Sequence, residues 1–367
     1  MRFIDFRRIF LFISVCLLMA CNQDVNDGVS ATFQSSFESD IQLEMIHEWT
    51  LNDPERFPNL TFFQFTGDGN LVVGDSSVLK IYLIDKEGNI LQTFAREGRG
   101  PGELISLVSL ATHPDGKIAV ADMNNRVIHI FNTADGSFLT IDYIPGWNTT
   151  LHWIDEKLFM VNNPFIIRIR NVPSGSWVIK LYDPVSDTKE ELMILELELQ
   201  NEPPDQISCT FCPIAFADEH SFYTIKNDST YRFHKVDIQT GEYDTFDFSG
   251  ISTAVKFSES ELERIRESRR RSSEISGVDR SDIELPTFKR RFVNLFVDAE
   301  KRVWFQLNVP EDSPGYFDVF SENGDYLGFV KFPENAQSVA FLNQSNILFR
   351  LPTDDPDRYS LKLYGIR

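Results

Sequence analysis

The chain has 367 residues, of which 13% are aromatic, and a formal net charge of −20 at pH 7. Such an acidic chain repels phosphate backbones and anionic lipid surfaces, so nucleic acid is excluded as an expected partner. Because the acidic residues are spread along the chain instead of forming a tail, solubility is the simplest explanation of the charge.

The first residues have the pattern of a secretory signal. Three arginines precede an apolar run that ends in Leu18–Cys21. At about ten residues the run is too short to span a bilayer, which needs roughly 20. Its last four residues resemble the bacterial lipobox, and this resemblance implies diacylation of Cys21 and removal of residues 1–20. An ordinary secretory signal with a chance cysteine is the open alternative.

Residues 21–40 are rich in Asn, Asp, Ser and Gln, and we predict that they form a flexible tether. Acyl chains on Cys21 would hold the protein on a membrane without a spanning helix. By family resemblance, Asn22 followed by the early acids Asp24 and Asp27 suits sorting to the outer membrane. We therefore expect a lipid-anchored protein of the bacterial cell envelope that faces either the periplasm or the surface.

From residue 60 onward the chain is a series of short strand-like runs, and two segments align almost without gaps. Residues 67–91 and 114–139 share a glycine turn, an apolar strand that ends in Asp, a second strand and a second turn. The two copies are offset by about 47 residues, which is typical of propeller blades with several strands per repeat. Weaker copies begin near Asp155, Asp218, Asp298 and Asn343.

The last of these copies ends without a fourth strand. Residues 42–50 alternate like a strand and precede the first repeat, so we predict that they pair outside the final hairpin. This pairing would close the ring and remove two exposed sheet edges. The sequence thus predicts an all-β, six-bladed β-propeller over residues 41–367, with four-stranded antiparallel blades.

Residues 94–103, followed by 113–131, resemble an NHL repeat. The whole chain resembles the six-bladed propeller lipoproteins common in Bacteroidota-type bacteria. The match is good over about residues 60–140, fair over 290–367 and poor between. This resemblance implies the fold and says little about function, since most members of that group have no assigned activity.

The lengths of the connections predict two unlike faces. In a blade with strands a to d from the axis outward, the a–b and c–d hairpins lie on one face, and the b–c loops and d–a crossovers lie on the other. All the a–b and c–d turns are short here, which predicts a plain face. The long connections crowd the other, loop-rich face, where binding is expected: they are 95–104, 162–176, 196–213, 250–290, 307–315 and 351–358.

The largest insertion, about 250–290, contains Ser258 and Glu261 at the spacing of a capping box, which predicts the start of a short helix. The apolar stripe that follows is thin, and Arg269–Arg271 come next, so we predict a solvated helix. It is either a lid over the channel mouth or a decoration without function.

The residues offer little catalytic chemistry. Residues 98–102 have the glycine content of a phosphate loop, but no Lys-Ser/Thr and no helix follow, so a crossover turn is the better interpretation. Asp122, with Asn125 and Arg126, is expected to tie a b–c turn. The histidines are scattered and no Gly-x-Ser-x-Gly elbow occurs. We predict no catalytic residue and no metal ligand, and the cofactor, if any, stays unknown.

Cys209 and Cys212 form a single Cys-x-x-Cys pair. One such pair is half a zinc site at most, and the βαβ context of a thioredoxin-like motif is missing. In an oxidising envelope we interpret the pair as a local disulfide.

Two function classes remain. We favour a non-catalytic binding or scaffolding module that engages a protein, peptide or glycan through the loop-rich face. The alternative is a hydrolase or lyase of the lactonase or amidating-lyase kind, with one divalent metal at the mouth of the central channel. The candidate ligand-binding residues, chosen for their place on the loop-rich face, are Arg99, Asn125, Arg126, Asn163, Arg168 and Asn308.

Overall fold

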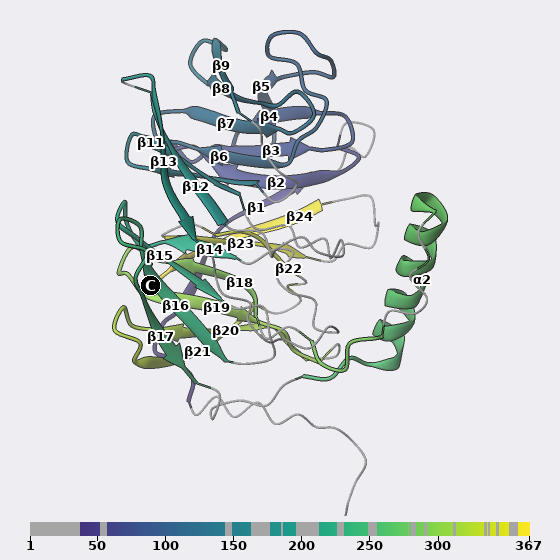
Figure 1. Cartoon of the computed structure of the whole chain (residues 1–367), viewed down its shortest axis with the longest axis vertical. Coiled ribbons are helices and arrows are strands. Elements are labelled where there is room, and N and C mark those ends of the chain that lie inside the picture. Colours follow the sequence, from purple (N-terminus) through teal and green to yellow (C-terminus); the bar gives the residue numbers. More distant parts are fainter. Residues whose placement is uncertain are drawn as a thin grey trace, which may run out of the picture. The chain divides into compact units, whose positions relative to one another are not determined.

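The strands of the computed structural model form six four-stranded sheets in which neighbouring strands run antiparallel (Figure 1). All the described residues belong to one compact unit, Gln34–Arg367. The structure describes residues 37–51, 57–143, 149–162, 177–184, 186–195, 213–225, 231–248, 255–277, 279, 284–289, 292–310, 313–333, 336, 338–342, 345–351 and 359–367.

Each sheet is one blade, and we list its strands a to d from the centre outward. Blade 1 contains β2 (Leu60–Phe65), β3 (Leu71–Asp75), β4 (Lys80–Ile84) and β5 (Ile90–Phe94), and blade 2 contains β6 (Ser109–Thr112), β7 (Lys117–Asp122), β8 (Val127–Asn132) and β9 (Phe138–Asp142). Blade 3 contains β10 (Thr149–Ile154), β11 (Lys157–Asn162), β12 (Trp177–Asp183) and β13 (Thr188–Leu195), and blade 4 contains β14 (Ile214–Phe216), β15 (Ser221–Ile225), β16 (Arg232–Asp237) and β17 (Tyr243–Asp247). Blade 5 contains β18 (Phe292–Val297), β19 (Val303–Leu307), β20 (Tyr316–Phe320) and β21 (Tyr326–Lys331), and blade 6 contains β22 (Ser338–Leu342), β23 (Asn346–Leu351), β24 (Tyr359–Ile366) and β1 (Leu43–Leu51).

Burial changes from the inner to the outer strands of a blade. Every residue of β3 and all but the first of β7 are buried, because neighbouring blades cover both faces of these strands. In the outer strand β5, exposed and covered side chains alternate instead. The core therefore consists of clusters between blades: Ile81 and Phe94 of blade 1, for example, pack with Ile118 and Val120 of blade 2.

The predicted closure of the ring is confirmed. Strand β1 pairs antiparallel with β24 from Leu43 opposite Ile366 to Leu51 opposite Tyr359. Trp49 of β1 is 2% exposed and belongs to the same core cluster as residues of blade 1. The first and last strands of the described chain thus share one blade, and β1 covers the edge that β24 would otherwise expose.

Strand order gathers the long connections at one end of the blades, as the sequence predicts. The a–b and c–d turns, such as 66–70 and 321–325, make up the plain face. The d–a and b–c connections, including 95–108 and 248–291, belong to the loop-rich face.

Ion pairs between neighbouring blades fasten the plain face. Lys117 of blade 2 lies 3.2 Å from Glu156 of blade 3, and Lys157 of blade 3 lies 3.2 Å from Glu219 of blade 4. A third pair, 2.8 Å long, joins Lys235 of blade 4 to a c–d turn of blade 5. These partly exposed pairs contribute little energy each, but they leave the plain face with most of its lysines already engaged between blades.

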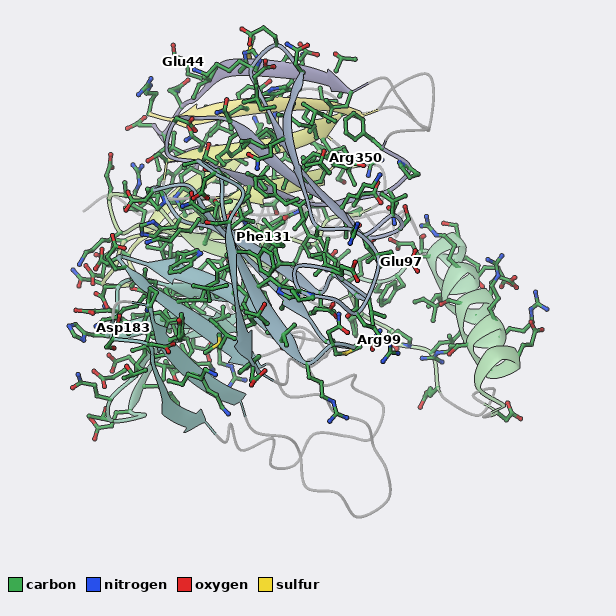
Figure 2. All side chains as sticks on the ribbon, turned by 90° about the horizontal axis from the view of Figure 1, so that it is seen from above. Glu44, Glu97, Arg99, Phe131, Asp183 and Arg350 are labelled. Carbon is green, nitrogen blue, oxygen red and sulfur yellow. The ribbon has the colours of Figure 1, made fainter. Side chains whose placement is uncertain are left out.

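Helix α2 (Glu259–Ser276) stands apart from the sheets in both views (Figures 1 and 2). Its predicted capping box is present, because the Glu261 amide donates to Ser258 Oγ and the Ser258 amide donates to the Glu261 carboxylate. At 18 residues it is longer than the short helix expected from the sequence. Ion pairs such as Arg270 with Glu267 and Glu274 extend it beyond its thin apolar stripe.

A short two-stranded stem carries α2. The Lys289 amide donates to Val255 O at 2.7 Å, and the side chain of Lys289 is only 7% exposed. Its ammonium lies 2.5 Å from Glu261 Oε1 and donates to Val309 O of blade 5 at 3.1 Å. Burial alone would raise the pKa of Glu261, but Lys289 and Ser258 outweigh it and hold that pKa below its ordinary value. The start of the helix is therefore fixed to the propeller.

Candidate functional site

The crossover from β5 to β6 (95–108) is the best-defined long connection on the loop-rich face, and a buried carboxylate holds its far end. Asp122, at the end of β7, is fully buried. It accepts hydrogen bonds from the amides of Ile105 and Ser106 in the crossover, and from the amides of Asn124 and Asn125 in its own b–c turn. As predicted, Asp122 ties a turn, and it ties the neighbouring crossover as well.

Blade 1 repeats this arrangement. Asp75 ends β3, is fully buried, and accepts from the Asn59 amide at 2.8 Å and from Ser77 Oγ at 2.7 Å. Both aspartates accept several hydrogen bonds from backbone and hydroxyl donors. We therefore interpret them as structural ties and not as catalytic groups.

The glycine-rich part of the crossover wraps around a side chain of its own. Gly100 N–H donates to Glu103 Oε2 at 2.7 Å, and Arg96 Nε donates to Glu103 Oε1 at 2.8 Å. A Cβ on Gly98, whose φ is 154°, would lie 2.0 Å from the same carboxylate. The amides that could cradle a phosphate therefore hold Glu103, which is the physical reason that this is a turn and not a phosphate loop.

Acidification should loosen this turn. The Gly100 amide, and then Arg96, hold the pKa of Glu103 below its ordinary value of 4.5. A carboxylate whose pKa is lower in the folded state than in the unfolded state stabilises the fold above the unfolded-state pKa. This stabilisation is lost as the pH falls through the folded-state pKa. We therefore expect the turn to stay closed above pH 4.5 and to loosen below it. Hydrogen exchange, corrected for intrinsic rates, should show Gly100 losing protection on acidification. In Glu103→Ala the protection should be low at every pH, and retained protection would contradict the assignment.

The structure brings three of the predicted ligand-binding residues together. Asn125 Nδ2 donates to Gly98 O at 3.2 Å, so the turn that holds Asn125 and Arg126 touches the backbone next to Arg99. Asn125 is half-buried and also donates to Asp122 and to Glu103 O, which makes it a brace and not a free ligand contact. The side chains of Arg99 and Arg126 are exposed.

The other predicted residues are not brought to this place. Asn308 lies in the b–c connection of blade 5, three blades away around the ring, and is half-buried. Asn163, Arg168, Cys21, Cys209 and Cys212 lie outside the described residues. Figure 2 shows Arg99 and Glu97 on the side of the propeller from which α2 projects.

Sequence reasoning missed two buried carboxylates. Asp318 in β20 is 2% exposed and accepts from the hydroxyls of Tyr231 and Tyr326. Asp298, in an a–b turn, binds Arg302 and accepts from Trp304 Nε1 at 2.8 Å. The only local signal for Asp318 is an acid inside an otherwise apolar strand, and its partners come from another blade and another strand.

Within the described residues, one group of three side chains could approach a metal ion: His113, Asp115 and Glu156. It lies on the plain face, and two of its three side chains, His113 and Glu156, already have partners. His113 Nε2 is 2.8 Å from Asp155 O of the next blade, while its Nδ1 accepts from the Asp115 amide. The Glu156 carboxylate pairs with Lys117. This histidine bridges blades 2 and 3, and we assign it no metal.

Six blades closed by a strand from the start of the described chain define a six-bladed β-propeller. No family model and no curated protein matches the sequence. Among the described residues, no helix is long and apolar enough to cross a membrane.

Comparison with solved structures gives the same fold. A Bacteroides vulgatus member of the DUF4221 family has a TM-score of 0.54 at 12% identity, covering 90% of this chain and 99% of its own. A Bacteroides fragilis protein described as a putative exported protein has a TM-score of 0.49 at 15% identity, with coverages of 89% and 95%. Virginiamycin B lyase from Staphylococcus aureus has a TM-score of 0.44 at 13% identity, with coverages of 88% and 99%. At 12% identity the first of these likenesses indicates the fold alone, and the other two, with TM-scores below 0.5, carry no argument.

Proposed function

We propose that this chain is a non-catalytic binding module of the bacterial cell envelope, which engages a protein, peptide or glycan through its loop-rich face. In this proposal residues 1–20 are a lipoprotein signal, Cys21 carries the lipid, and residues 21–40 tether the propeller to the membrane, most simply the outer membrane. A disulfide between Cys209 and Cys212 would fasten one of the long connections.

The observation that carries the proposal is the rigid presentation of the β5–β6 crossover. The Asp122 carboxylate fixes one end of the crossover, and the Glu103 carboxylate closes the other. The exposed Arg99 lies within the turn that Glu103 closes. A surface loop held in one conformation loses little entropy on binding, which favours recognition of a partner.

The enzymatic alternative needs free carboxylates, amides or imidazoles that converge at the channel mouth. In the part of the chain that the structure describes, the acids that end β3 and β7 both accept several hydrogen bonds from the protein. The group nearest to a metal site, around His113, lies on the opposite face. Binding therefore fits these residues better than hydrolysis or elimination.

Site-specific photo-crosslinking in the producing cells tests the proposal. A photoreactive residue at Glu97, exposed on the loop-rich face (Figure 2), should give a crosslinked adduct, whereas one at Asp135, exposed on the plain face, should give none. Equal adducts from both positions, or none from Glu97, would reject the loop-rich face as the binding surface. The same cells, fed a labelled fatty acid, test the anchor: the label should enter the wild type and not Cys21→Ala.

A further inference from the structure

Arginine is distributed unevenly between the two faces. Of the twelve arginines among the described residues, eight lie in the β5–β6 crossover, the 123–126 turn and α2. Two more stand near the loop-rich ends of strands, at Arg232 and Arg350. Only Arg302 and Arg367 lie on the plain face, where lysines make the pairs between blades. The loop-rich face is therefore the arginine face of an acidic protein.

Most of these arginines already have a partner within the chain. Arg96 binds Glu103, and Arg266, Arg270 and Arg271 bind glutamates of α2 itself. Arg99 and Arg126 differ, since the side chain of neither forms an ion pair or a hydrogen bond with any residue that the structure describes. Two exposed guanidinium groups on this face are thus left with open donors.

The backbones that carry these two arginines are fixed to each other. Arg126 has φ 61°, a left-handed conformation that is strained for a residue with a side chain and is held here by its turn. Its carbonyl accepts from the Tyr143 amide at 3.1 Å. The adjacent Asn125 donates to Gly98 O, which links this turn to the backbone immediately before Arg99. The backbones of the two positions are therefore held at a set spacing before any ligand arrives.

We propose that Arg99 and Arg126 form a carboxylate-binding pair that recognises an acidic segment of a protein partner. This inference rests on the proposed binding function of the loop-rich face and names the chemistry of what it binds. A planar guanidinium pairs with a carboxylate through two parallel hydrogen bonds, which a lysine ammonium cannot do. Arginine is also enriched where protein interfaces carry most of their binding energy.

A peptide fits this place better than an acidic polysaccharide does. Neither the crossover 95–108 nor the turn 123–126 contains an aromatic residue on which a sugar ring could stack. The neighbouring Phe138 ring is 42% exposed, and it is partly covered because it lies against Gly102 of the crossover. The net charge of −20 opposes a long polyanion, so a short acidic segment that reaches the pair locally is favoured over a repeating one.

The test is the binding of a fluorescein-labelled peptide of alternating glutamate and glycine, measured by anisotropy with the mature protein. We expect the double variant Arg99→Ala/Arg126→Ala to bind at least about tenfold more weakly than the wild type, since tenfold corresponds to about 1.4 kcal/mol. The variant Arg99→Lys/Arg126→Lys, which keeps the charge, should recover only part of the loss. The control Lys86→Ala/Arg367→Ala removes the same charge from exposed positions on the plain face and should bind like the wild type.

Several outcomes would overturn the inference. They are no binding by the wild type, an unchanged affinity in the Arg99/Arg126 alanine variant, an equal loss in the plain-face control, and tighter binding of polygalacturonate than of the peptide. If any of these occurred while the crosslinks still formed at Glu97 and not at Asp135, the proposed function would stand and the carboxylate pair alone would fall. Absence of crosslinks at Glu97 would instead count against the proposed function.

Discussion

Trp49→Ala is expected to lower the free energy of unfolding by about 3–5 kcal/mol, the usual cost of removing a buried aromatic ring. Trp49 lies on the closing strand β1 and is 2% exposed. Its ring belongs to a core cluster with Leu71 of blade 1 and Leu361 of blade 6. Its Nε1 donates to Asp85 O of blade 1 at 3.0 Å. One substitution therefore weakens the seam between blade 6 and blade 1 and removes one of the two donors to the Asp85 carbonyl, which keeps the Gly88 amide.

The same strand offers a matched control. Ile46 lies three residues earlier in β1 and is 50% exposed, so Ile46→Ala should change stability by no more than about 0.5 kcal/mol. Urea unfolding followed by far-UV circular dichroism measures both variants without relying on tryptophan fluorescence. If the two variants unfolded at the same urea concentration, β1 would be an appended strand and not the closure of the ring.

The period of the sequence was sufficient to predict the blades. The two strongest copies differ by about 47 residues, and a repeat of this length with several strands is the mark of a propeller. The closing strand was predictable because the last repeat is one strand short and residues 42–50 alternate. Glycine turns with positive φ, as at Gly69 and Gly116, fixed the a–b hairpins of the first two blades. These signals are all local or periodic.

The contacts that the sequence could not predict join residues that are far apart in the chain. The Tyr231 hydroxyl reaches Asp318 across 87 positions of the chain, and Lys157 reaches Glu219 across 62. No spacing within one repeat marks either pair, since the partners belong to different blades. Likewise, residues 37–39 pair in parallel with Phe329 of β21, although their composition predicts only a tether. Such contacts depend on how the blades are placed around the ring.

The candidate site also has features that the sequence predicts and features that only the fold reveals. The loop lengths predict which residues lie on the loop-rich face, and Arg99, Asn125 and Arg126 were chosen on that basis. The role of each residue within the site could not be predicted from the sequence. Asn125, for example, is a brace because the fold places Gly98 O and Glu103 O within reach of its side-chain amide. Glu103 was overlooked, although an acid three residues after a Gly-x-Gly could have suggested a carboxylate bound by its own loop.

Asp122→Ala is expected to destabilise the protein by about 3 kcal/mol or more, because hydrogen bonds to a charged group contribute about 1.5–3 kcal/mol and several are lost together. The carboxylate accepts from two amides of the crossover, two amides of its own turn, Ser106 Oγ and Asn125 Nδ2. Asp122→Asn keeps the volume but replaces one acceptor oxygen with a donor, so it should fall between the alanine variant and the wild type.

Asp122→Ala also tests whether the Asp122 carboxylate anchors the crossover that carries Arg99. Limited proteolysis should cut residues 95–108 much faster in Asp122→Ala than in the wild type, since the crossover loses its anchor. Asp135→Ala removes an exposed acid that accepts from Ser137 in its own plain-face turn, so it should lower stability far less than Asp122→Ala and leave cleavage of 95–108 unchanged. The acidic peptide should also bind Asp122→Ala more weakly, although Arg99 and Arg126 are intact, because their spacing is no longer fixed. If Asp122→Ala had the same stability and the same cleavage rate as the wild type, Asp122 would not be the anchor of the crossover. Other contacts would then have to hold Arg99 in place.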